Sequence, residues 1–158
     1  MMAHPSCVIP TAMPTPPPYV TFPRLGQLGR LGNQLFQMAA TVGVATKNCV
    51  PYCLPPWPYA RFLANPLPIC QPASAPIRYI ERSFAYQPIP ITEPTALVGY
   101  FQSEKYFAHC TPLMRRLLTM RPDFEAALTH HCQKSIHANS CSIHVRRTDY
   151  ISHSSLFD

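Results

Sequence analysis

The residues best suited to chemistry lie in the segment Ser142–Tyr150, which has the sequence SIHVRRTDY. Its residues alternate between apolar and polar, which predicts a strand with Ile143 and Val145 on one face. His144 and Arg146 then share the opposite face. A guanidinium can bind two phosphate oxygens at once, and an imidazole beside it can donate or accept a further hydrogen bond. The pattern therefore predicts a site for a phosphorylated ligand.

The residues that follow this strand allow two interpretations. Arg147 can reach the same ligand as the strand ends, and Asp149 begins the next turn. Alternatively, Arg146 or Arg147 forms an ion pair with Asp149 or Glu104 on a solvated edge. The residue types alone leave both interpretations open. A position at the end of a strand in an α/β unit favours the ligand site.

A second candidate site is the glycine-rich segment Leu25–Gln34. Gly26, Gly29 and Gly32 recur there at every third residue, and a loop of this kind can bring main-chain amides close to a ligand. The dinucleotide fingerprint places its glycines at the first, third and sixth positions, so a nicotinamide or flavin site is not supported. The alternative is a flexible turn without a ligand.

The elements around this loop predict a βαβ unit. A short strand at Tyr19–Phe22 precedes the loop, and a second strand at Cys49–Leu54 follows an apolar helix that ends near Lys47. Asn33 is the expected cap of that helix. The main-chain amides of Asn33 and Gln34 are then expected to point toward an anion or a sugar.

The middle of the chain, residues 55–94, is rich in proline, which makes long helices there unlikely to form. Trp57 is the single tryptophan, and it is expected to fill the core rather than to stack on a sugar. A small strand is predicted at Arg78–Glu81. A clearer strand is predicted at Thr95–Phe101.

Two helices are predicted after the last of these strands. Ser103 is a plausible cap, and Thr111 with the following proline opens a helix whose wetter side carries Arg115 and Arg116. A further helix extends from Pro122 to about Cys132. Its inward residues are expected to be Phe124, Ala127 and Leu128.

Composition limits the classes of partner. The 158 residues fit one domain with a hydrophobic core, and 13 Lys and Arg against 7 Asp and Glu give a formal charge of +6. Anionic partners are favoured by this balance. The positive residues form no run of five or six, so nucleic-acid binding is the weaker interpretation and no nucleic acid is expected.

Seven cysteines form no regular spacing, so no disulfide framework can be deduced. A zinc site that uses His130, His131, Cys132 or Cys141 lacks a paired ligand motif, and free thiols are the expected alternative. No apolar stretch approaches the length of a transmembrane helix. Residues 1–18 are interrupted by prolines and predict a disordered or polyproline-like arm.

Three separated segments together resemble the α-1,2-fucosyltransferases of glycosyltransferase family 11. They are Gly29–Gln37, Gly99–Phe107 and His144–Tyr150, and the match extends over about residues 29–151. The resemblance implies a galactoside α-1,2-fucosyltransferase that moves fucose from GDP-fucose to O2 of a galactose-terminated glycan with inversion. It also implies an α/β, Rossmann-like fold, with two such domains arranged as in GT-B glycosyltransferases, and no catalytic metal.

The family pattern also assigns roles to individual residues. GDP-fucose binding is assigned to His144, Arg146 and Arg147. Arg146 is also the expected catalytic residue, because a metal-free enzyme needs a cation beside the departing β-phosphate. Asp149 is the nearest acid and the candidate general base. The acceptor side of the cleft is assigned to Gly32, Asn33 and Gln34.

The resemblance predicts three regions: a proline-rich arm at 1–18, an acceptor-side domain at 19–138 and the start of the GDP-fucose domain at 139–158. On this view the chain is truncated after the arginine motif. Thr148 stands where many of these enzymes have glycine, so the motif does not fix the glycosidic linkage that the enzyme forms. The alternative is an inactive remnant that acts as a phosphate-binding, glycan-binding or interaction module. Animal relatives imply a membrane-linked location in the Golgi lumen.

Overall fold

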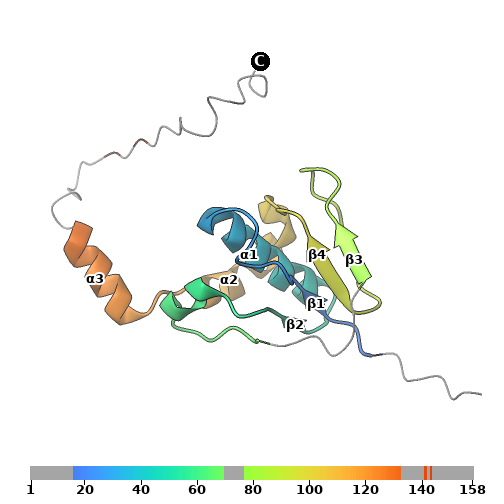
Figure 1. Ribbon diagram of the computed structural model, residues 1–158, viewed down its shortest axis with the longest axis horizontal. Helices are drawn as coiled ribbons and strands as arrows, with labels where there is room; N and C mark the ends of the chain where they lie inside the picture. Colours follow the sequence, from blue (N-terminus) through green and yellow to red (C-terminus); the bar gives the residue numbers. More distant parts are fainter. Residues whose placement is uncertain (1–15, 70–76, 133–140, 142, 144–158) are drawn as a thin grey trace, which may run out of the picture. The chain divides into compact units, whose positions relative to one another are not determined.

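The chain divides into two units, Met1–Arg121 and Pro122–Asp158, which are described separately (Figure 1). The first unit carries a sheet with its covering helices, and the described part of the second carries one helix. The computed structural model describes residues 16–69, 77–132, 141 and 143.

The first unit is built on a four-stranded parallel sheet in the order β2-β1-β4-β3. Val20 of β1 pairs with Tyr52 of β2 on one side and with Thr95 of β4 on the other. The predicted α/β class is therefore confirmed. The strands are β1 (Val20–Thr21), β2 (Tyr52–Cys53), β3 (Ile77–Ile80) and β4 (Thr95–Val98).

The predicted βαβ unit is confirmed, with α1 (Leu31–Lys47) connecting the parallel neighbours β1 and β2. Its central residues are apolar on nearly every side, and residues 37–45 are buried. The prediction that Asn33 caps this helix is wrong. The helix begins three residues earlier than predicted, with Arg30 at the N-cap position and no side-chain cap. Asn33 and Gly32 therefore lie within the first helical turn.

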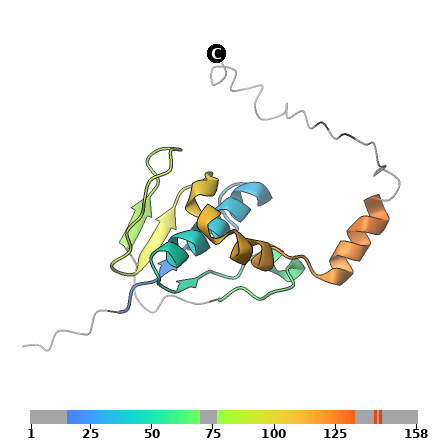
Figure 2. The same cartoon turned by 180° about the vertical axis from the view of Figure 1, so that it is seen from behind.

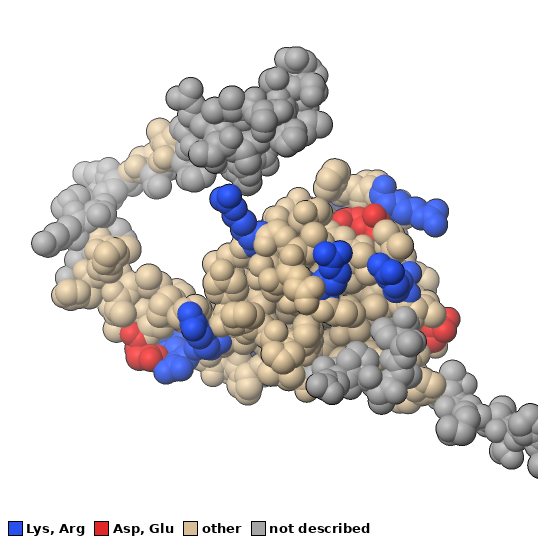
Figure 3. Space-filling view, in the orientation of Figure 1, with Lys and Arg blue, Asp and Glu red and all other residues tan. Residues whose placement is uncertain are grey.

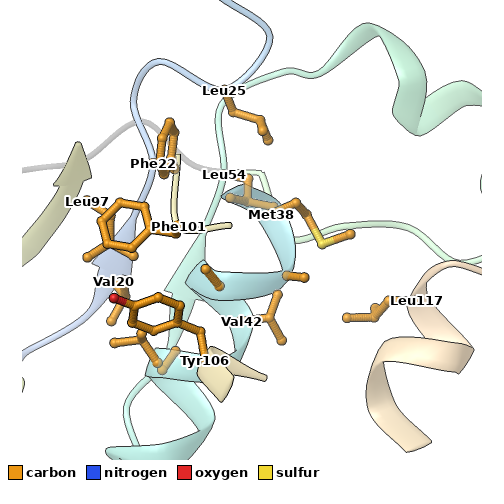
Figure 4. Close-up of a cluster of buried hydrophobic side chains, with 14 of the residues drawn as sticks. Val20, Phe22, Leu25, Met38, Val42, Leu54, Leu97, Phe101, Tyr106 and Leu117 are labelled. Carbon is orange, nitrogen blue, oxygen red and sulfur yellow. The ribbon is translucent and has the colours of Figure 1, made fainter. Parts of the chain in front are cut away.

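The core lies between α1 and the sheet (Figure 4). Phe22 and Phe101 are both fully buried and meet edge to face, with their ring centroids 6.3 Å apart. Met38 of α1 is also fully buried. Trp57 is 5% exposed, so the prediction that it fills the core is confirmed.

Gly99 to Phe101 form a sharp turn after β4. The strand therefore ends at Val98, whereas the predicted strand extended to Phe101. The φ angles of Gly99 and Phe101 are +155° and +51°, which are incompatible with a continuing strand. Ser103 then caps a short 3-10 turn, η2 (Glu104–Tyr106), as predicted, and its Oγ accepts from the N–H of Lys105 at 3.4 Å.

A second 3-10 turn, η3 (Ala108–Cys110), leads into α2 (Thr111–Leu117). The predicted start of α2 is confirmed, and Arg115 and Arg116 are exposed as expected. Seen from behind, α1 and these turns lie on the same side of the sheet (Figure 2). A further 3-10 turn, η1 (Pro58–Phe62), follows Trp57.

The described helix of the second unit is α3 (Pro122–Cys132), which has the predicted bounds. Its predicted inward face is wrong, because no residue of α3 is buried and Leu128 is 39% exposed. Ala127 is exposed and Phe124 is half-buried. Spacing along a helix predicts which residues share a face, but it does not predict whether another element packs against that face.

Candidate functional site

The carboxyl ends of β1 and β4 are the place where the order of the strands reverses. From β1 the chain crosses to β2 on one side, and β4 later joins β1 on the other side. In open parallel sheets, ligands bind in the crevice outside such a reversal. The glycine-rich segment follows β1 and the Gly99 turn follows β4, so both predicted motif segments reach this end of the sheet.

Side chains of α1 hold the glycine-rich segment from within the protein. Gln34 Nε2 donates to the carbonyl of Gly29 at 3.0 Å, and Gln37 Nε2 donates to the carbonyl of Leu28 at 3.0 Å. The indole N–H of Trp57 donates to Gln34 Oε1 at 2.9 Å. Gln34 is 5% exposed, so its side chain serves the loop and the core.

The prediction that the main-chain amide of Gln34 points toward a ligand is wrong, because this amide donates to the carbonyl of Arg30 at 3.1 Å. Gly29 has a φ of +74°, and a Cβ there would collide with the side chain of Asn33. Gly32 has no such restriction, since a Cβ on it would meet no atom within 4 Å. Of the two glycines, only Gly29 is required by the backbone.

Asn33 joins the two motif segments. Its side-chain Oδ1 accepts from Gln102 Nε2 at 2.6 Å, which connects the first turn of α1 to the chain that follows β4. This hydrogen bond is exposed and Asn33 is half-buried, so the pair lies at the surface of the crevice. Asn33 is therefore the member of the predicted acceptor-side set that a ligand can reach through its side chain.

A groove of about 310 Å³ opens beside these segments, at the carboxyl ends of β3 and β4. Its walls are mainly apolar, Phe84 is 75% exposed and the Arg82 side chain is exposed. We call it the β3–β4 groove. The lining residues are Leu28, Ile80, Glu81, Arg82, Ser83, Phe84, Val98, Gly99 and Tyr100.

Glu81 shapes this groove, a role that the sequence analysis did not predict. Its Oε2 accepts from the N–H of Tyr100 at 2.6 Å, and both carboxylate oxygens accept from the N–H of Phe101 at 3.0 and 3.1 Å. The carboxylate therefore holds the turn in which Phe101 adopts its positive φ. An acidic residue at the end of a strand facing Gly-Tyr-Phe on its neighbour was the available signal.

Tyr106 is the last residue of η2, the 3-10 turn that follows the Gly99 turn, and two contacts hold its side chain. Its hydroxyl accepts from the N–H of Gln87 at 3.4 Å, and its ring meets Tyr86 edge to face at 4.9 Å. Burial raises the pKa of Tyr106 above its usual value. The phenol therefore stays neutral at physiological pH and serves as an anchor rather than as a base.

The cysteines differ in their chemical state. Cys53 of β2 is disulfide-bonded, whereas Cys49, Cys110, Cys132 and Cys141 are free. Burial raises the pKa of the Cys110 thiol, which donates to the carbonyl of Phe107 at 3.3 Å, so this residue is a poor nucleophile. Within residues 16–69, 77–132, 141 and 143, no three His, Cys, Asp or Glu residues are gathered as metal ligands.

The predicted donor-site residues His144, Arg146, Arg147 and Asp149 lie outside the described residues. Ile143 is described, is 83% exposed and lies outside any strand, so the structure does not place it on a buried strand face. None of the described helices is long and apolar enough to cross a membrane.

Basic side chains on the visible face lie at several separate places (Figure 3). On this face they do not form the continuous stripe that binding along a nucleic-acid backbone requires.

A scan against models of protein families and searches of curated proteins and of solved structures found no match to this chain. The resemblance to the fucosyltransferases therefore rests on its three sequence motifs and stays a prediction. The structure describes the first two motifs in full, and the hydrogen bond between Asn33 and Gln102 connects them.

Proposed function

We propose that this chain is a galactoside α-1,2-fucosyltransferase that transfers fucose from GDP-fucose to O2 of a galactose. The observation that carries the proposal is the hydrogen bond between Asn33 and Gln102, at 2.6 Å. It brings two of the three motif segments together at the carboxyl end of a parallel sheet, where such sheets bind ligands. A groove with an exposed aromatic ring opens beside them.

The proposed acceptor site is the β3–β4 groove. A volume of about 310 Å³ is sufficient for one sugar ring, and the apolar face of a galactose can lie against the exposed ring of Phe84. Arg82 at the rim offers donors to sugar hydroxyl oxygens. In the proposed GT-B arrangement, the acceptor-side domain thus contributes an apolar groove with the Arg82 guanidinium at its rim.

The proposed donor site is the arginine motif. His144, Arg146 and Arg147 bind the pyrophosphate of GDP-fucose, with the guanidinium groups paired to phosphate oxygens. The resemblance implies no metal or other cofactor, so the positive charge at the phosphates comes from these side chains. Arg147 also supports the turn that follows Arg146.

The proposed reaction is a direct displacement at the anomeric carbon of fucose. The galactose O2 attacks this carbon as its bond to the β-phosphate oxygen breaks, and the O2 proton passes to a general base, for which Asp149 is the candidate. Negative charge grows on the departing GDP. Arg146 opposes that charge, and a fixed donor of this kind supplies about 3 to 4 kcal/mol of transition-state stabilisation.

The disulfide of Cys53 supports an oxidising compartment for this chemistry. Disulfides persist in secretory compartments and outside the cell, and they are rare where glutathione keeps thiols reduced. We therefore propose a lumenal setting such as the Golgi. Expression in an oxidising host and mass mapping of the Cys53 peptide without reduction test this part of the proposal.

The enzyme proposal is tested by incubating the 158-residue chain with GDP-fucose and a β-galactoside, and by measuring fucosylated product with mass spectrometry. NMR of the product identifies the linkage to O2. Arg146→Ala is expected to lower turnover by at least about a hundredfold, because it removes the charge that opposes the leaving group. Arg115→Ala changes an exposed arginine on α2 and is the matched control.

Absence of both turnover and GDP-dependent stabilisation would overturn the proposal. Saturable galactoside binding without turnover would instead identify a glycan-binding module. Equal loss of turnover in the Arg146→Ala and Arg115→Ala variants would show that the effect of Arg146 is not specific to the donor site.

A further inference from the structure

The outer side of β3 carries a second surface, which shares Ile80 and Arg82 with the rim of the β3–β4 groove. In the part of the chain that the structure describes, β3 is an edge strand, with β4 on one side and no strand on the other. A cavity of about 440 Å³ lies against it. The lining residues are Arg78, Tyr79, Ile80, Arg82 and Gln87.

The main chain of β3 has hydrogen-bonding groups directed away from the sheet. The N–H groups of Ile77 and Glu81 donate to the carbonyls of Pro94 and Val98, each at 2.9 Å, so these residues face β4. Successive main-chain groups of a strand point to opposite sides. The N–H and C=O groups of Arg78 and Ile80 therefore point to the open edge.

The side chains on this edge suit a charged partner of opposite sign. Arg78 and Ile80 share one face of β3 by strand alternation, and Arg82, two residues beyond the end of the strand, lines the same cavity. Neither arginine has an ion pair with a described residue, and Ile80 between them is 55% exposed. Charged side chains on edge strands commonly prevent unwanted pairing with other chains. Here two unpaired cations flank an open apolar position beside a cavity.

We propose that the β3 edge receives an extended acidic segment of a partner protein, which adds to the sheet as a further strand. Main-chain groups of the segment pair with Arg78 and Ile80, and its carboxylates lie against the guanidinium groups of Arg78 and Arg82. This is an interaction surface beyond the proposed transferase reaction. It uses the general mode in which an extended peptide joins an exposed sheet edge.

A second copy of this chain is a poorer occupant for electrostatic reasons. Two edge strands related by a two-fold axis pair in antiparallel fashion, and an axis at Ile80 places Arg78 of one copy opposite Arg82 of the other. Like charges directly opposite each other destabilise strand pairing. Acidic side chains at the same positions would stabilise it, so charge selects a foreign acidic segment over self-association.

The test is titration of the full chain with a short acetylated peptide in which glutamate alternates with valine. Amide hydrogen exchange, followed by NMR, is expected to slow at Arg78 and Ile80 and to stay unchanged at Ile77 and Tyr79. A control peptide of the same sequence with every backbone nitrogen methylated keeps its carboxylates but lacks the N–H groups needed for pairing in either strand direction, and it is expected not to bind. A lysine version of the peptide tests the sign of the charge.

The double variant Arg78→Glu/Arg82→Glu is expected to weaken binding of the glutamate peptide by about tenfold, because both cross-strand pairs change from attraction to repulsion. The double variant Arg115→Glu/Arg116→Glu makes the same change of net charge on α2 and is expected to leave binding unchanged. The exchange measurement on the unmodified chain does not depend on whether these variants fold.

Several results would overturn the proposal. Equal binding of the N-methylated peptide would show attraction by charge without strand pairing. Equal losses in the two double variants would show that net charge alone matters. Protection of Arg78 and Ile80 on self-association without peptide would identify a second copy as the occupant, and the same protection with inorganic sulfate alone would identify a simple anion site.

Discussion

The two sides of the carboxyl end of the sheet use their polar residues in opposite ways. After β1, the side chains of Gln34, Gln37 and Trp57 are used in hydrogen bonds within the protein, and Gln34 is 5% exposed. Beyond β4, the exposed Arg82 and Phe84 line a groove. The β1 side is closed by its own side chains, whereas the β3 side is open.

A glycine-rich segment that is suited to ligand binding can therefore serve as part of the scaffold instead. The glycine-rich segment was expected to present amides to a ligand, yet its conformation depends on two glutamines of α1. The proline-rich region that carried no motif supplies the groove wall around Phe84. Substitutions on the closed β1 side are therefore expected to lower the stability of the fold, and substitutions on the open β3 side are expected to weaken ligand binding.

The largest effect is expected when the packing of α1 is disturbed. A Cβ at Gly43 would collide with the carbonyl of Tyr106 and lie 2.8 Å from Phe107, so Gly43→Ala is expected to lower the free energy of unfolding by about 3 kcal/mol. Gly32→Ala on the same helix meets no atom and is the matched control. Urea denaturation measures both. Similar losses in the two variants would show that the close approach at Gly43 carries little energy.

A smaller loss of stability is expected from the closed loop itself. Gln34→Ala leaves the buried N–H of Trp57 and the carbonyl of Gly29 without their partner, so it is expected to cost about 2 kcal/mol. Gln102→Ala removes an exposed hydrogen bond and is expected to cost less than about 1 kcal/mol. If Gln34→Ala keeps full stability but loses ligand binding, the two sides do not differ as described.

The smallest change in stability is expected on the open side. Phe84 is 75% exposed, so Phe84→Ala is expected to change the free energy of unfolding by less than about 0.5 kcal/mol. The same variant is expected to weaken galactoside binding by about tenfold, because it removes the ring on which the sugar is proposed to lie. Isothermal titration calorimetry measures the binding. Leu128→Ala, at an exposed leucine of α3, is the control, and an equal loss there would contradict a role for the groove.

Local pattern was sufficient to predict most elements of the fold. The apolar run after the glycine-rich segment indicated a buried helix, and the flanking strands made the βαβ unit of β1, α1 and β2. Thr111 with the following proline predicted the start of α2. These predictions succeeded because helix initiation by proline and the burial of an apolar run depend on neighbouring residues.

Contacts between distant residues were beyond the reach of the same reasoning. Gln34 bonds Trp57 across 23 positions, and Gln102 bonds Asn33 across 69. Glu81 fixes the turn after β4 from a neighbouring strand. Residue types showed that these groups could form hydrogen bonds, but their partners depend on how the strands are ordered.

Local sequence patterns were sufficient to predict a βαβ unit, an apolar central helix and an arginine motif suited to a phosphorylated ligand. The position of β3 at the edge of the described sheet and the role of Gln34 in the scaffold follow only from the tertiary structure. The physical reason is the range of the interactions. Periodicity and capping act within one element, whereas strand order and burial emerge only when distant segments pack together.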